Sequence, residues 1–416
     1  MFSFRIVVAV SALLLATSCR YVLSLDEFEG EGPADARQDA RQDVDAATSD
    51  GPMAIDAALE PRPIQIGAGR NHTCALISNG EVWCWGDHAW GQLGISHPPG
   101  GYRTTPTLVP GLNDVVELAV AREHVCVRHA DNTVSCWGHN ATGALGNGNF
   151  GDQGRPVSVS LPPVAQVATT EEFTCARLVD GSAWCWGNNS SGQLGNGSAT
   201  GTVATPVEVN LGGVAIDDIA PGLNHTCASR SDGGTALCWG SNQVSQLGNA
   251  GGSSPNPVAA SISGELDLWA GDYHTCALLG NGQVHCWGDG AAARLGRDIS
   301  PDFHTPVPGP VDGLSAVTSG MSQDHSCVVE KQTAYCWGRN EFEQLGPNSI
   351  GLGTSITPLE VPIEGVTGTV LEVATGLAHS CAIRTDGTVW CWGDNLRGKL
   401  GNGDVTASAT PVMAAF

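Results

Sequence analysis

From residue 64 to the C-terminus, short runs of apolar and β-branched residues alternate with turns rich in glycine, serine and asparagine. One kind of run begins at a proline, as in Thr205-Pro206-Val207. A second kind, such as Val115-Val116-Glu117-Leu118-Ala119, leads into a cysteine. No long stretch keeps the 3.6-residue period of an amphipathic helix. The pattern therefore predicts an all-β domain in which each repeated unit offers about four short strands.

The tripeptide Cys-Trp-Gly marks a repeat of about 50 residues. It starts at seven positions that are 48 to 55 residues apart: Cys84, Cys136, Cys185, Cys238, Cys286, Cys336 and Cys391. A Gln-Leu-Gly triplet or a close variant follows each of them, as at Gln193-Leu194-Gly195. A fixed period of this length indicates a solenoid or a propeller. Seven units of four antiparallel strands fit a seven-bladed β-propeller, which closes on itself and leaves only short sheet edges.

Three motifs in each repeat resemble the regulator of chromosome condensation repeat, a family of seven-bladed propellers. They are His-Thr-Cys-Ala-Leu, then Asp-Gly-Thr-Val-Trp-Cys-Trp-Gly-Asp-Asn, then a Gln-Leu-Gly-Asn-Gly block, which residues 188–197 match best. The resemblance covers residues 64–416. It implies the propeller fold and, as the family's best-known activity, nucleotide exchange on a small GTPase with attachment to chromatin. No functional residue of that activity is carried over to this sequence.

Fourteen of the fifteen cysteines form seven pairs, each of which flanks a predicted hairpin turn such as Ser78-Asn79-Gly80. A three-residue loop with glycine at its third position places Cys74 directly opposite Cys84, within reach of a disulfide. We therefore predict seven disulfides within blades: Cys74–Cys84, Cys126–Cys136, Cys175–Cys185, Cys227–Cys238, Cys276–Cys286, Cys327–Cys336 and Cys381–Cys391. Paired but reduced thiols are the alternative. A metal site is not expected, because no C-x-x-C spacing occurs.

The proline-initiated strands also predict how the ring closes. A last one, Thr410-Pro411-Val412, follows the final hairpin, whereas the first hairpin lacks one at the usual distance. Pro63 lies 11 residues before Cys74, while Pro106 lies 20 residues before Cys126. We therefore expect the C-terminal strand to complete the blade that begins with residues 64–86 and so to close the ring.

The N-terminus has the pattern of an export signal. Arg5 precedes an apolar run over residues 6–16, which is shorter than the roughly 20 residues that a membrane-spanning helix needs. The following Ala16-Thr17-Ser18-Cys19 resembles the lipobox of bacterial lipoproteins, which usually has leucine in place of Ala16. The resemblance implies that Cys19 is lipidated; an ordinary cleaved signal is the alternative. Because Arg20 and not aspartate follows, we expect the outer membrane or cell surface as the location.

The segment from residue 20 to residue 62 is acidic and nearly free of aromatic residues. Such a composition cannot bury enough apolar area to offset the entropy of ordering the chain. The predicted organisation is therefore a lipoprotein signal peptide over residues 1–18, a disordered acidic tether over residues 19–63, and the propeller over residues 64–416. The membrane would be reached by the lipid anchor only.

The net charge and the absence of catalytic motifs reduce the number of function classes that fit the sequence. The chain has 19 Lys and Arg against 42 Asp and Glu, a net charge of -23, which argues against a nucleic-acid partner. Fifteen cysteines favour an oxidising compartment. No Walker A motif, nucleophile elbow or H-E-x-x-H motif appears, and no nucleophile is paired with a base. We expect a monomeric protein that is not an enzyme and holds no cofactor or metal.

Two residue types recur in the repeats and are candidates for chemistry. Six histidines each stand two residues before the first cysteine of a pair, where Phe173 takes their place in the third repeat: His72, His124, His225, His274, His325 and His379. A catalytic group has no reason to recur in every blade, so we expect these histidines to hydrogen-bond between blades. The tryptophans of Cys-Trp-Gly are expected in the core, because both faces of a blade are covered by neighbours.

The loops that differ between repeats are the candidate binding surface. They carry His97, Tyr102, Arg103, Phe150, Phe303 and His304, residue types that often anchor interfaces. We therefore predict a scaffold that binds a protein or another macromolecule. The alternatives are nucleotide exchange, inhibition of an extracellular enzyme, as some bacterial propellers of this family bind β-lactamases, and carbohydrate or cell-wall processing.

Overall fold

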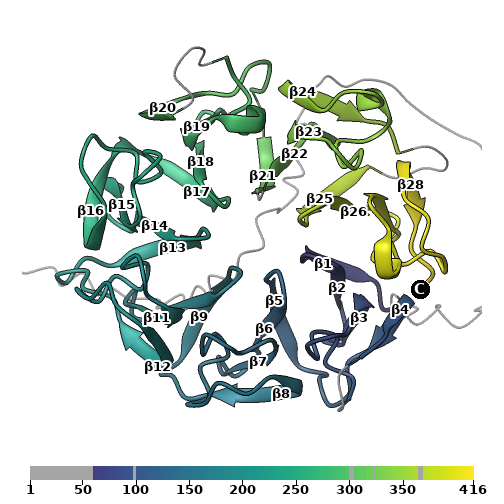
Figure 1. The fold of residues 1–416 in the computed structure, drawn as a ribbon, viewed down its shortest axis with the longest axis horizontal. Coiled ribbons are helices and arrows are strands. Elements are labelled where there is room, and N and C mark those ends of the chain that lie inside the picture. The colour runs from purple at the N-terminus through teal and green to yellow at the C-terminus, as the bar shows by residue number, and fades with distance from the viewer. Residues whose placement is uncertain (1–59, 97–99, 299–303, 316, 323, 364–368) are drawn as a thin grey trace, which may run out of the picture. The chain divides into compact units, whose positions relative to one another are not determined.

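The computed structural model describes residues 60–96, 100–298, 304–315, 317–322, 324–363 and 369–416. In this part of the chain, seven four-stranded antiparallel sheets are arranged as blades around a central axis (Figure 1). Each blade is built from four consecutive strands, and the first strand of each lies nearest the axis. The predicted seven-bladed all-β propeller is confirmed.

The strands of the first four blades are as follows. Blade 1 contains β1 (Pro63–Ala68), β2 (His72–Ile77), β3 (Val82–Asp87) and β4 (Tyr102–Leu108); blade 2 contains β5 (Val115–Val120), β6 (His124–His129), β7 (Val134–Gly138) and β8 (Gln153–Val159). Blade 3 contains β9 (Val164–Thr169), β10 (Phe173–Leu178), β11 (Ala183–Asn188) and β12 (Thr202–Glu208); blade 4 contains β13 (Ile216–Pro221), β14 (His225–Arg230), β15 (Thr235–Gly240) and β16 (Ser254–Ser263).

The remaining three blades complete the ring. Blade 5 contains β17 (Glu265–Ala270), β18 (His274–Leu279), β19 (Val284–Asp289) and β20 (His304–Pro310); blade 6 contains β21 (Val317–Ser322), β22 (His325–Glu330), β23 (Thr333–Arg339) and β24 (Thr354–Val361). Blade 7 contains β25 (Val370–Thr375), β26 (His379–Arg384), β27 (Val389–Gly393) and β28 (Ser408–Met413). Three short 3-10 turns, η1 (Ala291–Ala293), η2 (Pro347–Ser349) and η3 (Leu396–Gly398), lie in the connections to the fourth strands.

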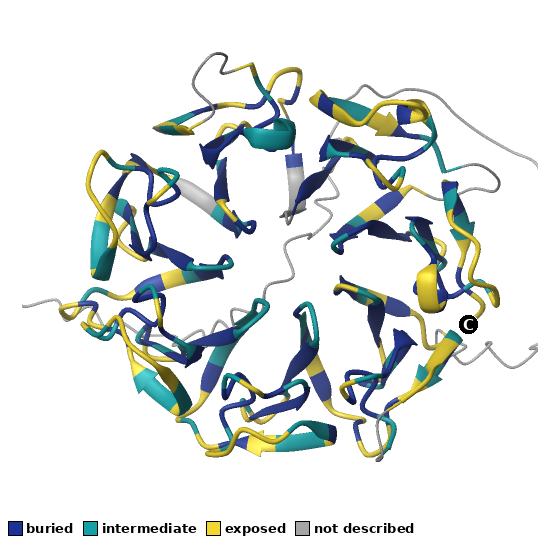
Figure 2. Cartoon of the chain, viewed as in Figure 1, coloured by how far each residue is buried: buried dark blue, intermediate teal, exposed yellow. Residues whose placement is uncertain are grey.

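The two middle strands of each blade form most of the core. All six residues of β2 are buried, whereas the outer strand β4 is largely exposed. Figure 2 shows the same gradient around the ring, with mostly buried residues in the middle of the blades and exposed residues along the outer rim. This gradient follows from the architecture, because a middle strand is covered by neighbouring blades on both faces and by strands on both edges.

Seven disulfides join the second and third strands of the blades, one in each blade, and they link the cysteine pairs expected from the hairpin spacing. Cys74 is directly opposite Cys84 in the strand register, with their Cα atoms 4.1 Å apart. Gly80, the third residue of the turn between them, has φ +83°. The shorter hairpin of blade 6 instead turns through Lys331 and Gln332, both with positive φ, as a two-residue loop requires.

The predicted closure of the ring is wrong. The C-terminal strand β28 pairs with β27 as the outer strand of blade 7, and β4, which contains Pro106, completes blade 1. The prediction divided the repeat into blades at the wrong point. In the structure, a blade begins with the apolar run that precedes its hairpin, and the proline-initiated strand after that hairpin is the last strand of the same blade. The residues after β28 do reach blade 1, where the Phe416 ring lies edge-on to Trp85 at 5.6 Å.

The seams between blades repeat one hydrogen-bonding pattern. The carbonyl before each Leu-Gly pair accepts a hydrogen bond from the indole of the next blade's Cys-Trp-Gly, as Ala144 does from Trp186 at 2.8 Å. The same carbonyl accepts the hydroxyl of Thr174, the residue before the next blade's first cysteine. The Cys-Trp-Gly tryptophans are 0 or 1% exposed, as expected for core residues.

The recurring histidines complete this pattern. Because the Thr174 hydroxyl donates to a carbonyl, it must accept from His124 Nε2, 2.9 Å away. Five of the six histidines contact a threonine or serine hydroxyl of the next blade in this way, so the prediction of structural histidines is confirmed for them. His72 differs: Val125 stands where the other seams have a hydroxyl, and neither ring nitrogen of His72 has a hydrogen-bond partner among the described residues.

Within the part of the chain that the structure describes, no helix has the length and apolar character needed to cross a bilayer.

Candidate binding face and central channel

The propeller has two distinct faces because its strands run up and down in sequence order. The connections between first and second strands and between third and fourth strands emerge at one end of every blade, which we call the loop face. The tight hairpins between second and third strands, together with the links from blade to blade, emerge at the opposite end, the turn face. Candidate sites lie on the loop face and in the channel along the axis.

The loops after the third strands are held by a buried side chain. In blade 2, Asn140 Oδ1 accepts the backbone N–H of Leu145, while its Nδ2 donates to Asn149 O and Gly151 O. Buried asparagines at the equivalent positions of blades 3, 4, 6 and 7 accept the same Leu N–H: Asn189, Asn242, Asn340 and Asn395. His88 does so through Nδ1 in blade 1. The loop tips are therefore fixed by internal hydrogen bonds.

At the tips of these loops, three consecutive blades expose large apolar side chains. Phe342 in blade 6, Leu396 in blade 7 and Trp90 in blade 1 are 49, 61 and 41% exposed. The corresponding positions of the other four blades carry smaller or polar residues: Ala141 and Thr142, Ser190 and Ser191, Gln243 and Val244, and Ala291 and Ala292. We call Phe342, Leu396 and Trp90 the apolar arc.

Two loop tips of the arc, those of blades 1 and 7, contain a glycine that packs closely against the next blade. A Cβ on Gly91, beside Trp90, would lie 2.7 Å from the Cα of Gly154 in blade 2. A Cβ on Gly398 would lie equally close to Thr104 Cα in blade 1. Trp90 also packs on His139 of blade 2, with ring centroids 4.7 Å apart. The tips that carry Trp90 and Leu396 thus each bridge two blades and present their apolar side chains from a rigid base.

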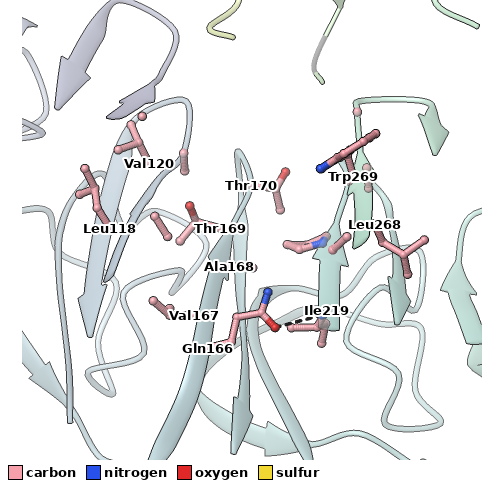
Figure 3. Close-up of a pocket in the computed structure, with 18 of the residues that line it drawn as sticks. Leu118, Val120, Gln166, Val167, Ala168, Thr169, Thr170, Ile219, Leu268 and Trp269 are labelled. Carbon is pink, nitrogen blue, oxygen red and sulfur yellow. Dashed lines mark hydrogen bonds between the residues drawn. The ribbon is translucent and has the colours of Figure 1, made fainter. Parts of the chain in front are cut away.

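The central channel contains a cavity of about 360 Å³ lined by the first strands of the blades (Figure 3). The third residue of each of several first strands hydrogen-bonds the backbone of the next one. Gln166 Oε1, for example, accepts the N–H of Ile219, as the dashed line in Figure 3 marks. Equivalent bonds run from Leu118 N to Gln65, from Val167 N to Glu117 and from Leu268 N to Asp218. Glu372 of blade 7 makes the corresponding bond to the backbone of Ile66 in blade 1.

Burial changes the protonation of the channel carboxyls. It raises the pKa of Glu372 to about 8, because only one backbone hydrogen bond offsets the loss of water. Burial, and then the neighbouring Asp218 carboxylate, raises the pKa of Asp267 well above its usual value. A pKa of about 8 favours the protonated form of Glu372 at neutral pH, and the pKa of Asp267 is shifted in the same direction. Among the described residues, no three or more His, Cys, Asp or Glu side chains converge as a metal-binding group.

An ion pair crosses the loop-face mouth of this channel. Arg122 of blade 2 contacts Glu171 of blade 3 at 2.8 Å and also contacts Asp272 of blade 5. Burial raises the pKa of Asp272 to about 6, although Arg122 opposes the shift. Because blades 2 and 5 are not neighbours, this contact spans the opening.

Family models match nearly all of the folded part. The repeat model described as regulator of chromosome condensation (RCC1) repeat matches residues 64–92, and the RCC1-like domain model matches residues 103–415. The chain belongs to the RCC1-like domain family. The resemblance seen in the repeat motifs is thus confirmed.

Relatives of this RCC1-like propeller have varied names. The E3 ubiquitin-protein ligase HERC2 of Homo sapiens is 27% identical over 380 residues, which cover 88% of this chain but 7% of HERC2. The ultraviolet-B receptor UVR8 of Arabidopsis thaliana is 27% identical over 379 residues, covering 88% of this chain and 73% of UVR8. Two solved structures show the same fold. Prp20p of Saccharomyces cerevisiae has a TM-score of 0.70 at 20% identity and covers 82% of this chain and 87% of its own. Human WBSCR16 also has a TM-score of 0.70 at 20% identity, covering 81% and 94%.

The predicted loop residues of this RCC1-like propeller share the loop face but not one patch. Tyr102 and Arg103 are exposed at the start of β4 in blade 1, and Phe150 is half exposed in the loop before β8 in blade 2. His304 begins β20 in blade 5, with its Nε2 3.8 Å from Asp289 Oδ1, three blades away from Phe150. His97 and Phe303 lie outside the described residues.

Sequence reasoning missed the apolar arc. Trp90, Phe342 and Leu396 lie inside the conserved-looking repeat block rather than in the loops of variable length, so they were passed over. The signal was nevertheless present. Aligning the seven blocks on Leu-Gly shows that the positions three and four residues before the leucine vary in size and polarity, whereas the position five residues before it is asparagine in five of the seven blocks.

Proposed function

We propose that this protein is an exported, non-enzymatic propeller that binds another protein through the apolar arc on its loop face. The observation that carries the proposal is the exposure of Phe342, Leu396 and Trp90 at equivalent tips of three consecutive blades. Neighbouring exposed apolar side chains on a soluble surface mark interaction sites more often than isolated ones do. The fold supports this proposal, because RCC1-like propellers commonly serve as binding scaffolds.

The rigid mounting of the arc also favours a binding role. Its loops are held by buried asparagine or histidine side chains, and those of Trp90 and Leu396 also rest on the next blade, so little conformational entropy is lost when a partner binds. Tryptophan and other large side chains anchored in this way are the residues that contribute most to protein interfaces. A catalytic role has no comparable support among the described residues.

We further propose that the protein acts outside the cytoplasm and is held at the outer membrane or cell surface by lipid on Cys19. Seven disulfides support an oxidising environment. Mass spectrometry of the native N-terminal peptide should show a diacylated or triacylated Cys19. Cleavage at another position, with Cys19 absent or unmodified, would contradict the anchor.

Nucleotide exchange is the alternative that the family suggests. A solved structure of Prp20p is described with its binding to Gsp1p and histones, and those partners belong to that protein. The disulfides and the net charge of -23 argue against a cytosolic GTPase or chromatin as the partner here. The proposal would be overturned if micromolar full-length protein stimulated GDP release from a small GTPase and lost this activity on reduction.

The binding proposal is tested with the full chain, purified in detergent and incubated with surface extract under cross-linking. Trp90→Ala combined with Phe342→Ala should abolish the cross-linked product seen with wild type. Val179→Ala is the matched control, because Val179 is 62% exposed on a turn-face hairpin. Equal cross-linking by the arc variant, or its loss in the control alone, would show that the partner binds elsewhere.

A further inference from the structure

The exposed positive charges of the propeller are concentrated on one sector of the loop face. The described part of the chain has six exposed Arg and Lys residues: Arg62, Arg70, Arg103, Arg155, Lys331 and Arg397. Arg62 and Lys331 lie on the turn face. The other four lie toward the loop face of blades 7, 1 and 2, around Leu396 and Trp90. In a chain with a net charge of -23, four of the six exposed cationic side chains described are thus gathered in one sector.

A chain of contacts joins the arginines to the apolar arc. Arg397, next to Leu396, lies 3.4 Å from Asp87, and Asp87 pairs with Tyr102 in the strand register, one residue before Arg103. On the other side, Trp90 packs on His139, whose backbone N–H donates to Glu123 O. Arg70 contacts the carboxylate of that same Glu123 at 3.4 Å. Arg155 is next to Gly154, whose Cα would lie 2.7 Å from a Cβ on Gly91, beside Trp90. These contacts place the four arginines on adjoining segments of blades 7, 1 and 2.

Carboxylates of the protein leave much of this positive charge available. Asp87 and Glu123 each contact one arginine of the sector only at 3.4 Å, and Asp394 is engaged at 2.6 Å by Lys399 instead. Arg103 donates to the carbonyl of its neighbour Tyr102. On the loop face of blades 7, 1 and 2, Asp404 is the one acidic residue in the exposed class among those described. A guanidinium has five N–H donors, so most remain free for a ligand.

We propose that blades 7, 1 and 2 bind a segment of a partner protein that carries carboxylates beside apolar or aromatic side chains. This inference rests on the proposed binding function and specifies its partner. Arginine presents a planar fork that matches a carboxylate, and the central Leu396 and Trp90 supply the apolar contact around which such pairs become partly desolvated. A few carboxylates on a short segment can pair with the arginines of this sector. A long polyphosphate would extend beyond the sector and be repelled by the acidic remainder of the surface.

The test uses the full chain in detergent and a phage-displayed library of random 15-residue peptides as the probe. The enriched peptides should combine Asp or Glu with Trp, Phe, Leu or Ile. A variant with Arg103→Glu and Arg155→Glu should weaken a selected peptide by about ten-fold or more, with a steeper loss at low salt. Arg62→Glu with Lys331→Glu makes the same charge change on the turn face and should leave affinity unchanged. Circular dichroism and non-reducing peptide mapping verify that both variants are folded.

Each outcome decides one of the two proposals. Peptides that depend on Trp90 but not on Arg103 and Arg155 would overturn the acidic-partner inference and leave the binding function standing. Peptides weakened only by the turn-face changes would overturn both. Arginine-dependent binding of phosphatidylglycerol vesicles or heparin, without any acidic peptide, would show that the sector recognises another class of anion and would also overturn the inference.

Discussion

The seams between blades and the tips of the loop face are built from the same repeat, yet they behave in opposite ways. At the seams, an indole, a hydroxyl and an imidazole recur with nearly unchanged contacts from blade to blade. At the tips, equivalent positions hold tryptophan, phenylalanine, serine or alanine. The shared contacts thus hold the ring together, whereas the proposed binding surface is formed where the repeats differ. The varying tip residues lie only a few positions before the Leu-Gly pair whose preceding carbonyl belongs to the seam.

The largest expected difference is between two tryptophans. Trp239→Ala removes a fully buried indole and its hydrogen bond to Gln193 O across the seam of blades 3 and 4. We expect a loss of about 3–5 kcal/mol in the free energy of unfolding. Trp90→Ala, at an exposed tip, should cost about 0.5 kcal/mol or little more. Denaturant unfolding under non-reducing conditions measures both, and similar losses would contradict the separation of roles.

Removing one disulfide should have a smaller effect that stays within its blade. Replacing both Cys126 and Cys136 with serine opens a loop whose ends are 10 residues apart. The expected cost is about 2–3 kcal/mol in the chain-entropy model, without loss of the ring. Thermal unfolding of this double variant provides the measurement. A link between cysteines of different blades in the remaining protein, detected by peptide mapping, would contradict the within-blade pairing.

The exceptional seam of blades 1 and 2 offers a change in the stabilising direction. Val125→Thr gives His72 the hydroxyl that other seams have, and the new hydroxyl can donate to the carbonyl of Gln92, which already accepts the Trp137 indole. We expect a gain of about 1 kcal/mol. The reverse change in the next seam, Thr174→Val, should cost a similar or larger amount because it leaves His124 unpaired. If both variants destabilise equally, the hydroxyl is not what distinguishes the seams.

The smallest effect concerns Glu372, a carboxyl that lines the channel, and depends on pH. Glu372 has a folded pKa of about 8 against an ordinary value of 4.5, so its contribution to stability is present below pH 4.5 and is lost as the pH rises through 8. Glu372→Gln, which copies Gln65 and Gln166, should weaken this loss while retaining the bond to Ile66. Denaturation midpoints between pH 5 and pH 9 provide the measurement. An unchanged pH slope would show that Glu372 is ionised in the fold.

Buried histidines act in the opposite direction in the same experiment. Burial lowers the pKa of His124 and His225 to about 3, so their contribution is present above pH 6.5 and is lost as the pH falls toward 3. The Glu372→Gln variant should therefore retain the acid-side loss of wild type. This internal comparison separates the channel carboxyl from the seam histidines.

The sequence predicted the parts of the molecule that repetition makes visible. Seven Cys-Trp-Gly tripeptides and their turns were sufficient to deduce the blades, the strand register at Cys74 and Cys84, and the hydrogen-bonding role of His124. Repetition does not show where one blade ends and the next begins, however, because a repeat that runs around a ring can be divided into units at any point. This is why β28 was assigned to the wrong blade. It says nothing about contacts between distant units, such as Arg122 with Asp272, which depend on the width of the channel.

The site was predictable only in part for a related reason. Loop length and odd residues drew attention to Tyr102, Arg103 and Phe150, which do lie on the loop face. The apolar arc depends instead on which of seven equivalent positions become neighbours, and the arginine sector depends on which side chains remain exposed. Exposure is a property of the packed ring. Arg384 at the end of β26 is buried, whereas Arg397 in η3 is exposed.

The confinement of every disulfide to a single hairpin has a consequence for biogenesis. The paired cysteines are separated by 9 to 11 positions, and none of these links joins one blade to another. If the chain is exported as proposed, each hairpin can therefore be oxidised as soon as it reaches an oxidising compartment, before the following blade has been delivered. Correct pairing then requires no rearrangement of disulfides between distant cysteines. The disulfides can form in the order in which the hairpins are synthesised. The last blade is complete only when the C-terminal strand has been synthesised. The hairpins of the earlier blades can already be cross-linked by then.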